Sequence, residues 1–246
     1  MPTLTYSVVV PMHNESAHIS TLISQMTDTV AHALGGPQEI WMIENGSTDT
    51  TASEARAMAE LLRSAGWMAH VIELTKANYG AAMREGFRQA NGDWVINFDI
   101  DYFSGPFVRG LEDSKADVVI ASKRAPGSDD RRSRLRRLAT WGFNLTLRTL
   151  LRSKITDTHG IKAFRRQVLS EVEPLTSSTF DLFDTELVLR AERMGFQIAE
   201  VPIVVEERRA ASNSLLKRVP RTLAGVLSIK MQFTRERSGV AARLGS

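Results

Sequence analysis

The sequence contains no cysteine. Its absence excludes a disulfide framework, a thiolate nucleophile and a cysteine zinc site, and it agrees with a reducing cytoplasm. No run of about 18 apolar residues is present, so we expect no membrane-spanning helix. The apolar run 6–12 is too short for a signal peptide and no basic segment precedes it, so we expect no secretion signal.

Internal repeats and low-complexity linkers are also missing from the 246 residues. The hydrophobic share of 43% and the charged share of 24% are ordinary for a globular protein large enough to bury a sizeable core. We expect one main domain over residues 1–210, followed by a basic amphipathic extension over residues 211–246.

The basic residues are unevenly distributed. The net charge is only +3, yet arginine and lysine crowd into residues 123–137 and 208–237. Such a field suggests a polyanionic partner, while a solvated surface is an equally good explanation. We expect no nucleic-acid partner, because aromatic residues are not interleaved with the basic run 131–137 and no nucleic-acid motif is present.

Apolar residues recur at helical spacing near the C-terminus. Leu223, Val226, Leu227 and Met231 alternate with basic residues, which suits a helix in a membrane interface. A helix packed on the domain explains the same pattern and is slightly preferred. Trp141, inside the arginine-rich segment, is a second candidate for membrane contact. We therefore expect a cytoplasmic protein, with peripheral contact to the cytoplasmic face of a membrane as an open option.

Short apolar runs alternate with amphipathic segments. The predicted strands are 6–11, 39–43, 68–74, 93–98, 117–122, 161–164 and 198–206, and the predicted helices are 17–34, 49–65, 79–90, 138–151 and 185–194. This alternation predicts an α/β fold, with a doubly wound, mostly parallel sheet flanked by helices and a C-terminal helical extension.

Polar residues follow several of these strands. Those at or just past a predicted strand end are Glu15, Glu44, Asn45, Asp99, Asp101 and Lys123. Because ligands bind beyond the carboxyl ends of parallel strands, we expect these residues to converge on one crevice. Residues 45–47 predict a tight turn, with Ser47 or Asp49 capping the next helix, and for Asp49 this capping role is preferred over contact with a ligand.

Asp99-Ile100-Asp101 is the sharpest chemical signal. Two carboxylates, one residue apart, directly follow a central apolar strand. In an extended segment residues i and i+2 point the same way, so both carboxylates can approach one Mg²⁺ or Mn²⁺ ion. Such an ion would bridge diphosphate oxygens and neutralise the charge that builds on a leaving group.

Short motifs that follow one another along the chain carry a family resemblance. They are Val8-Val-Val-Pro-Met-His-Asn-Glu15, Glu44-Asn-Gly-Ser-Thr-Asp49, Asn78-Tyr-Gly-Ala-Ala82, Phe98-Asp-Ile-Asp101, Ala121-Ser-Lys-Arg124, Asp157-Thr-His-Gly-Ile-Lys-Ala-Phe-Arg165, Phe183-Asp-Thr-Glu-Leu187 and Glu200-Val-Pro202. In this order they resemble the inverting family 2 glycosyltransferases of GT-A fold, and most of all the dolichyl- and polyprenyl-phosphate sugar synthases. The resemblance covers roughly residues 6–220.

The resemblance implies a Rossmann-like GT-A fold and a metal-dependent enzyme. It would move a hexose, with inversion, from a nucleotide-sugar (GDP-mannose or UDP-glucose) to a polyprenyl phosphate. The implied cofactor is Mg²⁺ or Mn²⁺ on Asp99 and Asp101, and Asp99-Ile100-Asp101 would contact the donor diphosphate. Arg208 or Arg209 would reach the donor phosphates. The implied nucleotide pocket is lined by Pro11, Asn14, Glu15, Glu44 and Asn45.

The same resemblance implies an acceptor site. Arg124, and Arg136 with Thr140, match residues that hold the acceptor phosphate in the prenol-phosphate enzymes, and with Asp101 they make up the implied catalytic set. A phosphate is already an anion at neutral pH, so it attacks without a strong protein base. Such an enzyme mainly positions two anions and screens their repulsion, a task that suits bidentate arginines.

A second interpretation is the same fold acting on a soluble hydroxyl acceptor, such as a polysaccharide, a small glycoside or a natural product. A hydroxyl needs a carboxylate base, for which Asp157 and Asp184 are the candidates. A nucleotide-sugar binder without turnover is disfavoured, because Asp99 and Asp101 are both intact.

Overall fold

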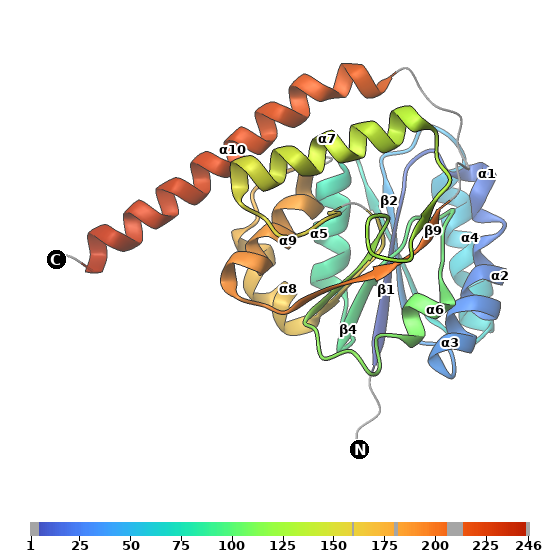
Figure 1. The fold of residues 1–246 in the computed structure, drawn as a ribbon. Coiled ribbons are helices and arrows are strands. Elements are labelled where there is room, and N and C mark those ends of the chain that lie inside the picture. The colour runs from blue at the N-terminus through green and yellow to red at the C-terminus, as the bar shows by residue number, and fades with distance from the viewer. Residues whose placement is uncertain (1–4, 159, 180–181, 206–213, 245–246) are drawn as a thin grey trace.

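The computed structural model describes residues 5–158, 160–179, 182–205 and 214–244, and the side chains of the last helix over 219–236 (Figure 1). The predicted donor residues Arg208 and Arg209 lie outside the described residues. Within the described part of the chain, no helix is long and apolar enough to cross a membrane.

A seven-stranded sheet forms the centre of the fold, in the order β3-β2-β1-β4-β7-β5-β8. Its strands are β1 (Tyr6–Met12), β2 (Glu39–Asn45), β3 (Met68–Leu74), β4 (Trp94–Asn97), β5 (Val118–Ser122), β7 (Lys162–Arg165) and β8 (Ile198–Pro202). Only β7 runs antiparallel to its neighbours, β4 and β5. The short strands β6 (Asp129–Asp130) and β9 (Val204–Val205) pair separately. The predicted doubly wound, mostly parallel sheet is confirmed.

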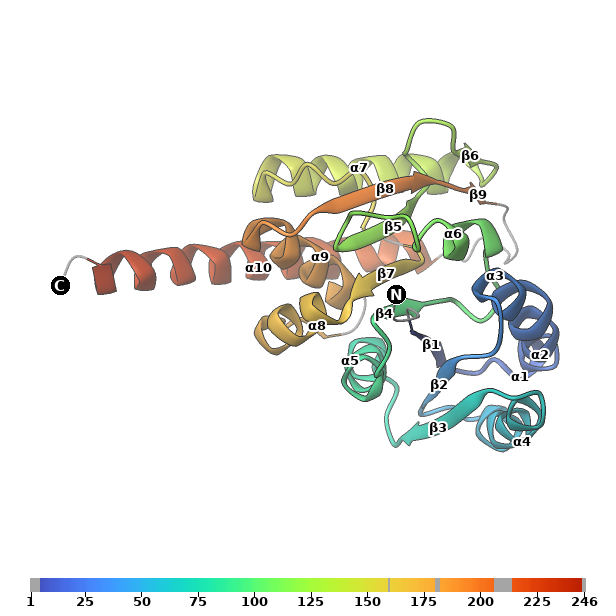
Figure 2. The same ribbon diagram turned by 90° about the horizontal axis from the view of Figure 1, so that it is seen from below.

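Helices cover both faces of the sheet (Figure 2). On one face lie α1 (Ser16–Ile19), α2 (Leu22–Ser24), the π-helix η1 (Gln25–Ala31), α3 (His32–Leu34), α4 (Thr51–Ser64) and α6 (Gly105–Arg109). On the other lie α5 (Tyr79–Gln89), α8 (Arg166–Val172), the 3-10 helix η2 (Glu173–Leu175) and α9 (Phe183–Met194). Side chains alternate along β1, so Val8 and Val10 pack in one core and Val9 packs in the other.

Two predicted helices differ from the structure in continuity or by more than two residues at one end, while the other three agree within two residues. The expected helix 17–34 is interrupted after Ile19 and continues through the π-helix η1. Near the break the hydroxyls of Thr21 and Ser24 donate to the carbonyls of His18 and Thr21, so the side chains compete for backbone acceptors. The helix α7 (Arg134–Leu151) begins four residues before the expected Leu138, because arginine and leucine continue a helix well.

The C-terminal helix α10 (Ser214–Leu244) packs on α7 and α9 through a third hydrophobic cluster. This cluster contains Leu147, Leu151, Leu182, Leu189, Val226, Ile229 and Phe233. The preferred prediction, a C-terminal helix that packs on the domain, is therefore confirmed for Val226. Three other residues of the predicted stripe, Leu223, Leu227 and Met231, remain exposed.

The closest approach of a helix to the sheet gives a stability prediction. A Cβ atom on Gly86 of α5 would overlap Val9 Cγ1 on the central strand, whereas one on Gly142 of α7 would meet open space. Alanine gains about 0.5–1 kcal/mol over glycine in a helix interior, and overpacking a core costs about 1–3 kcal/mol. Gly86→Ala should therefore lower the free energy of unfolding in urea, and the control Gly142→Ala should raise it. Stabilisation by both substitutions would contradict the packing at Val9.

Candidate active site

The loops that follow β1 and β2 are joined by hydrogen bonds. The Asn14 N–H donates to Ser47 Oγ at 2.9 Å, and Asn14 Oδ1 accepts the Thr48 N–H at 2.8 Å. His13 Nδ1 donates to the Asn45 carbonyl at 2.9 Å, since a carbonyl oxygen only accepts. Asn14 adopts a left-handed backbone (φ 55°), which asparagine tolerates better than most residues. The two loops are thus held side by side beyond the carboxyl ends of β1 and β2.

The turn after β2 is fixed by its own polar side chains. Glu44 is buried, and its Oε1 accepts the Ser47 N–H at 2.6 Å. Asn45 is also buried, and its Oδ1 accepts the Asn78 N–H at 2.7 Å. Gly46 has φ 62°, and a Cβ there would lie 2.7 Å from the Ala77 backbone nitrogen. Glu44 and Asn45 therefore shape the loop through contacts within the protein.

Two other residues near this turn have defined roles. The N-cap residue of α4 is Thr50, one residue after the predicted Asp49, but Asp49 Oδ1 does accept the Thr51 N–H at the start of the helix at 3.0 Å. Hydrogen bonds from Thr51 lower the pKa of Asp49 to about 2. The Glu15 N–H donates to Thr51 Oγ1 at 2.8 Å, which ties the end of β1 to the start of α4. Pro11 is half-buried within β1.

The carboxylate pair after β4 lies on a tight turn. The Tyr102 N–H donates to the Asp99 carbonyl at 2.9 Å, so the expectation of an extended Asp99-Ile100-Asp101 segment is wrong. Ile100 is buried in the core, whereas Asp99 keeps surface in contact with water although protein atoms surround its carboxylate. The pKa of Asp99 is raised, first because protein atoms crowd around it and then because Asp101 places a second negative charge nearby. The two carboxylates are therefore close enough to repel one another.

Two lysines bring positive charge to this turn. Lys123, just after β5, and Lys162, on β7, both act on Asp99 electrostatically and lower its pKa, against the effect of Asp101. Lys162 lies opposite Asn97 in the β4–β7 pairing, two residues before Asp99. The inserted antiparallel strand therefore places a cation beside the carboxylate pair.

Each lysine also makes a buried ion pair. Lys123 Nζ lies 2.8 Å from Asp157 Oδ2, and Lys162 Nζ lies 2.9 Å from Asp184 Oδ2. Tyr79 OH donates to the same Asp184 oxygen at 2.8 Å. All four charged side chains are at most 10% exposed. The two carboxylates considered as catalytic bases are thus both bound to lysines.

Lys162 and Tyr79 were not predicted as site residues. A lone lysine within the apolar segment 161–164 is the available signal, because a buried charge requires a partner. The sequence does not reveal which carboxylate that partner is. Asp101 and Lys123 both lie close enough to Asp99 to act on it electrostatically, and the convergence of the other strand-end residues on the same crevice stays a prediction.

The predicted acceptor residues lie at the ends of β5 and in α7. Arg124 follows β5 and is exposed. Arg136 lies in the first turn of α7 and is half-buried. Thr140 Oγ1 donates to the Arg136 carbonyl at 3.0 Å and accepts from Arg132, which pairs with Asp130 at 2.8 Å. Arg132 is thus a further arginine beside this pair that the sequence motifs did not single out.

Carboxylate oxygens are the ligands that Mg²⁺ and Mn²⁺ prefer, and a crowded carboxylate pair is stabilised by a cation. Across residues 5–158, 160–179, 182–205 and 214–244, no group of three or more histidine or acidic side chains is arranged to hold a metal. The Asp99–Asp101 pair therefore fits a metal that takes its remaining ligands from a bound molecule or water.

A parallel sheet with bonded β1 and β2 loops and a carboxylate pair after β4 has the layout expected of a nucleotide-sugar enzyme. The model of the glycosyl transferase family 2 matches residues 7–173 of this chain. The chain belongs to this family, and it is a glycosyltransferase.

Particular relatives narrow the comparison. Polyprenol monophosphomannose synthase of Mycolicibacterium smegmatis is 33% identical over 224 residues, covering 84% of this chain and 79% of the relative. Glycosyltransferase AglD of Haloferax volcanii is 27% identical over 236 residues, covering 93% of this chain. The chain spans only 37% of the length of AglD.

A solved structure shares the fold. Glucosyl-3-phosphoglycerate synthase from Mycobacterium tuberculosis, crystallised with Mn²⁺, uridine-diphosphate and glucosyl-3-phosphoglycerate, has a TM-score of 0.67 at 22% identity. The match covers 92% of this chain and 80% of that chain. The predicted GT-A fold is thereby confirmed.

The buried ion pair of Lys162 gives a second prediction. Removing one partner of a buried pair costs about 3–5 kcal/mol, whereas an exposed pair contributes at most about 1 kcal/mol. Lys162→Met should therefore lower the free energy of unfolding in urea far more than Arg131→Met, which breaks the exposed pair with Asp129. Adding Asp184→Asn to Lys162→Met should restore part of the loss. Equal effects of the two single substitutions would contradict a buried pair.

Proposed function

We propose that this glycosyltransferase moves a hexose, with inversion, from a nucleotide-sugar to a polyprenyl phosphate, using Mg²⁺ or Mn²⁺ at Asp99 and Asp101. The mycobacterial relative is named a polyprenol monophosphomannose synthase, which supports this acceptor class. The observation that carries the proposal is the engagement of Asp157 and Asp184 by buried lysines. A hydroxyl acceptor would have to compete with the lysine for the carboxylate oxygen that takes its proton, while a phosphate needs no base.

The donor would bind across the ends of β1, β2 and β4. Its nucleotide would lie on the joined loops that carry Pro11, Asn14, Glu15, Glu44 and Asn45. Its diphosphate would lie at Asp99-Ile100-Asp101, near the positive charge of Lys123 and Lys162. When bound, the divalent ion would neutralise the charge that develops on the departing nucleoside diphosphate. Arg208 or Arg209 is proposed to add a contact to the donor phosphates.

The acceptor phosphate would lie between Arg124 and the first turn of α7. Arg136 and Thr140 lie one helical turn apart, and Arg132 contacts Thr140. Guanidinium groups bind phosphate oxygens in pairs and hold an incoming anion close to a second one. Asp101 would orient the donor while these arginines orient the acceptor, and the phosphate oxygen would attack the anomeric carbon directly.

Residues 1–210 would form the catalytic domain and residues 211–246 a basic extension. A lipid-linked acceptor places the reaction at a membrane surface, and we propose the cytoplasmic face. GDP-mannose and UDP-glucose are the donors to be tested first.

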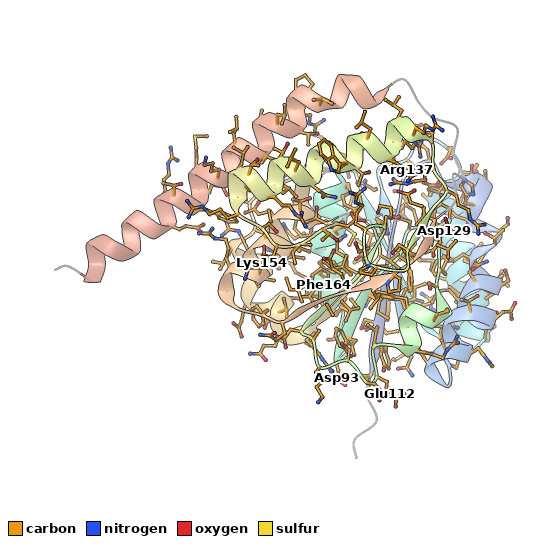
Figure 3. All side chains as sticks on the ribbon, in the orientation of Figure 1. Asp93, Glu112, Asp129, Arg137, Lys154 and Phe164 are labelled. Atoms are coloured by element: carbon orange, nitrogen blue, oxygen red, sulfur yellow. The ribbon has the colours of Figure 1, made fainter. Side chains whose placement is uncertain are left out.

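A donor-by-acceptor screen tests this function. Purified protein with Mn²⁺ should carry label from a radioactive nucleotide-sugar into the organic phase only when a polyprenyl phosphate is present. EDTA should abolish the transfer, and Asp101→Asn should lower it at least about 100-fold, the scale of losing a transition-state charge contact. Glu112 lies at the end of the molecule opposite to Arg137 in Figure 3, so Glu112→Gln should leave the transfer rate unchanged.

Two outcomes contradict the proposal. Sugar transfer at the full rate with EDTA present would show that the reaction needs no metal ion. Transfer of label to a water-soluble hydroxyl acceptor, and none to the lipid phosphate, favours the second interpretation with Asp157 or Asp184 as the base.

The acceptor arginines give a separate kinetic prediction. Losing a charged hydrogen bond to an anion costs about 1.5–3 kcal/mol, or roughly a 10- to 100-fold change. Arg136→Ala and Arg124→Ala should therefore raise the KM for polyprenyl phosphate by this factor and leave the donor KM nearly constant. The exposed Arg109 of α6 supplies the control, Arg109→Ala. An equal rise in the acceptor KM and the donor KM would contradict a role in acceptor binding alone and would indicate that these arginines also contact the donor.

A further inference from the structure

Two helices carry most of the exposed apolar surface. Among the described residues, eight large apolar side chains that are exposed lie on α7 and α10. They are Leu135, Leu138, Trp141 and Leu145 on α7, and Val219, Leu223, Leu227 and Met231 on α10. Leu138 is 62% exposed and Met231 is 55% exposed. Their spacing of three or four residues places each set on one face of its helix.

These exposed faces differ from the faces that hold the helices in place. The third hydrophobic cluster buries Leu147 and Leu151 of α7 and Val226, Ile229 and Phe233 of α10. The helices are therefore already docked on the domain without the exposed residues. An apolar area of this kind commonly marks a contact with a partner or a membrane.

The charges of the two helices are almost entirely positive. The sequence of α7 contains four arginines and no acidic residue. The sequence of α10 contains seven basic residues and a single acidic one, Glu236. Since the net charge of the whole chain is only +3, this end of the molecule is strongly basic and the remainder is acidic on balance. Apolar side chains flanked by arginine and lysine match the interface of an anionic bilayer.

We propose that the exposed face of α7 and α10 docks on an anionic lipid membrane. In Figure 1 α7 and the first part of α10 lie at the top of the molecule, the end toward which β1 runs, and α10 then continues away from the domain. Arg136 and Thr140, on α7 itself, would then lie at the level of the lipid headgroups. In the proposed function, this docking would present the acceptor site to a lipid phosphate at the membrane surface. The docking itself does not depend on that function.

A second copy of this chain is a poorer occupant of the same surface. A symmetric contact would bring the α7 and α10 arginines of both copies together, and like charges repel in a closed interface. An anionic membrane compensates these charges and takes up the apolar side chains at once.

Vesicle sedimentation tests the docking. The full chain should sediment with vesicles of phosphatidylcholine and phosphatidylglycerol, and at least about tenfold less with phosphatidylcholine alone or at high salt. Leu138→Asp with Leu227→Asp should lower the binding at least about tenfold, since each places a charge in the apolar layer. Leu61→Asp, on α4 and 55% exposed, is the matched control and should bind as the unaltered chain does.

Trp141 supplies an independent readout. It is 49% exposed, while Trp67 and Trp94 are buried and Trp41 is half-buried. Anionic vesicles should shift its fluorescence to shorter wavelength, brominated lipids should quench it, and Trp141→Phe should remove both effects. An absence of vesicle binding overturns the proposal, as does equal binding by the Leu138→Asp, Leu227→Asp variant.

Two further measurements separate the remaining explanations. A dimer in sedimentation velocity that Leu138→Asp dissociates would assign the surface to a second copy and overturn the proposal. With a short, water-soluble prenyl phosphate, the double variant should transfer sugar at the normal rate, while transfer to a vesicle-embedded acceptor should fall with binding. If the unaltered chain binds vesicles but transfers sugar to neither acceptor, the proposed function fails and the docking surface stands.

Discussion

The electrostatic balance at the carboxyl end of β4 is the constraint on which the site depends. Asp99 and Asp101 repel one another in a crowded part of the protein, and Asp184 adds further negative charge. Lys162 on the neighbouring strand β7, and Lys123 just after β5, offset this charge. The antiparallel strand β7 is the means by which Lys162 reaches this position, through its register with β4. The proposed ligand, an anionic diphosphate that arrives with a divalent cation, would fit this balance of charges.

The sequence predicted the sheet well because its central strands are continuous apolar runs that are buried on both faces, and because the strands end at clear turn residues. The runs that became β1, β2, β3 and β5 match the structure within two residues at each end. The antiparallel direction of β7 could not be predicted, since direction depends on pairing between distant segments. The interruption of the first helix was also missed, because the competition between hydroxyls and backbone acceptors is local and weak.

The site was predicted more completely for its residues than for their roles. The predicted position of Glu44 and Asn45 at the end of a strand was correct, but the side chains of Asn14, Glu44 and Asn45 accept hydrogen bonds from backbone N–H groups of the protein itself. Those partners lie about 30 or more residues away in two cases, and no pattern in the sequence encodes them. The extended geometry of Asp99 and Asp101 was wrong for a similar reason, because the bond between Tyr102 and Asp99 closes a turn.

The central claim is that the Asp99–Asp101 pair binds a metal together with a nucleoside diphosphate. Titration of Mn²⁺ followed by electron paramagnetic resonance tests it most directly. Two carboxylates alone form a weak site, so we predict that UDP or GDP tightens Mn²⁺ binding at least about tenfold and that Asp99→Asn with Asp101→Asn removes this gain. Tight Mn²⁺ binding that neither the nucleotide nor the double substitution alters would contradict the account.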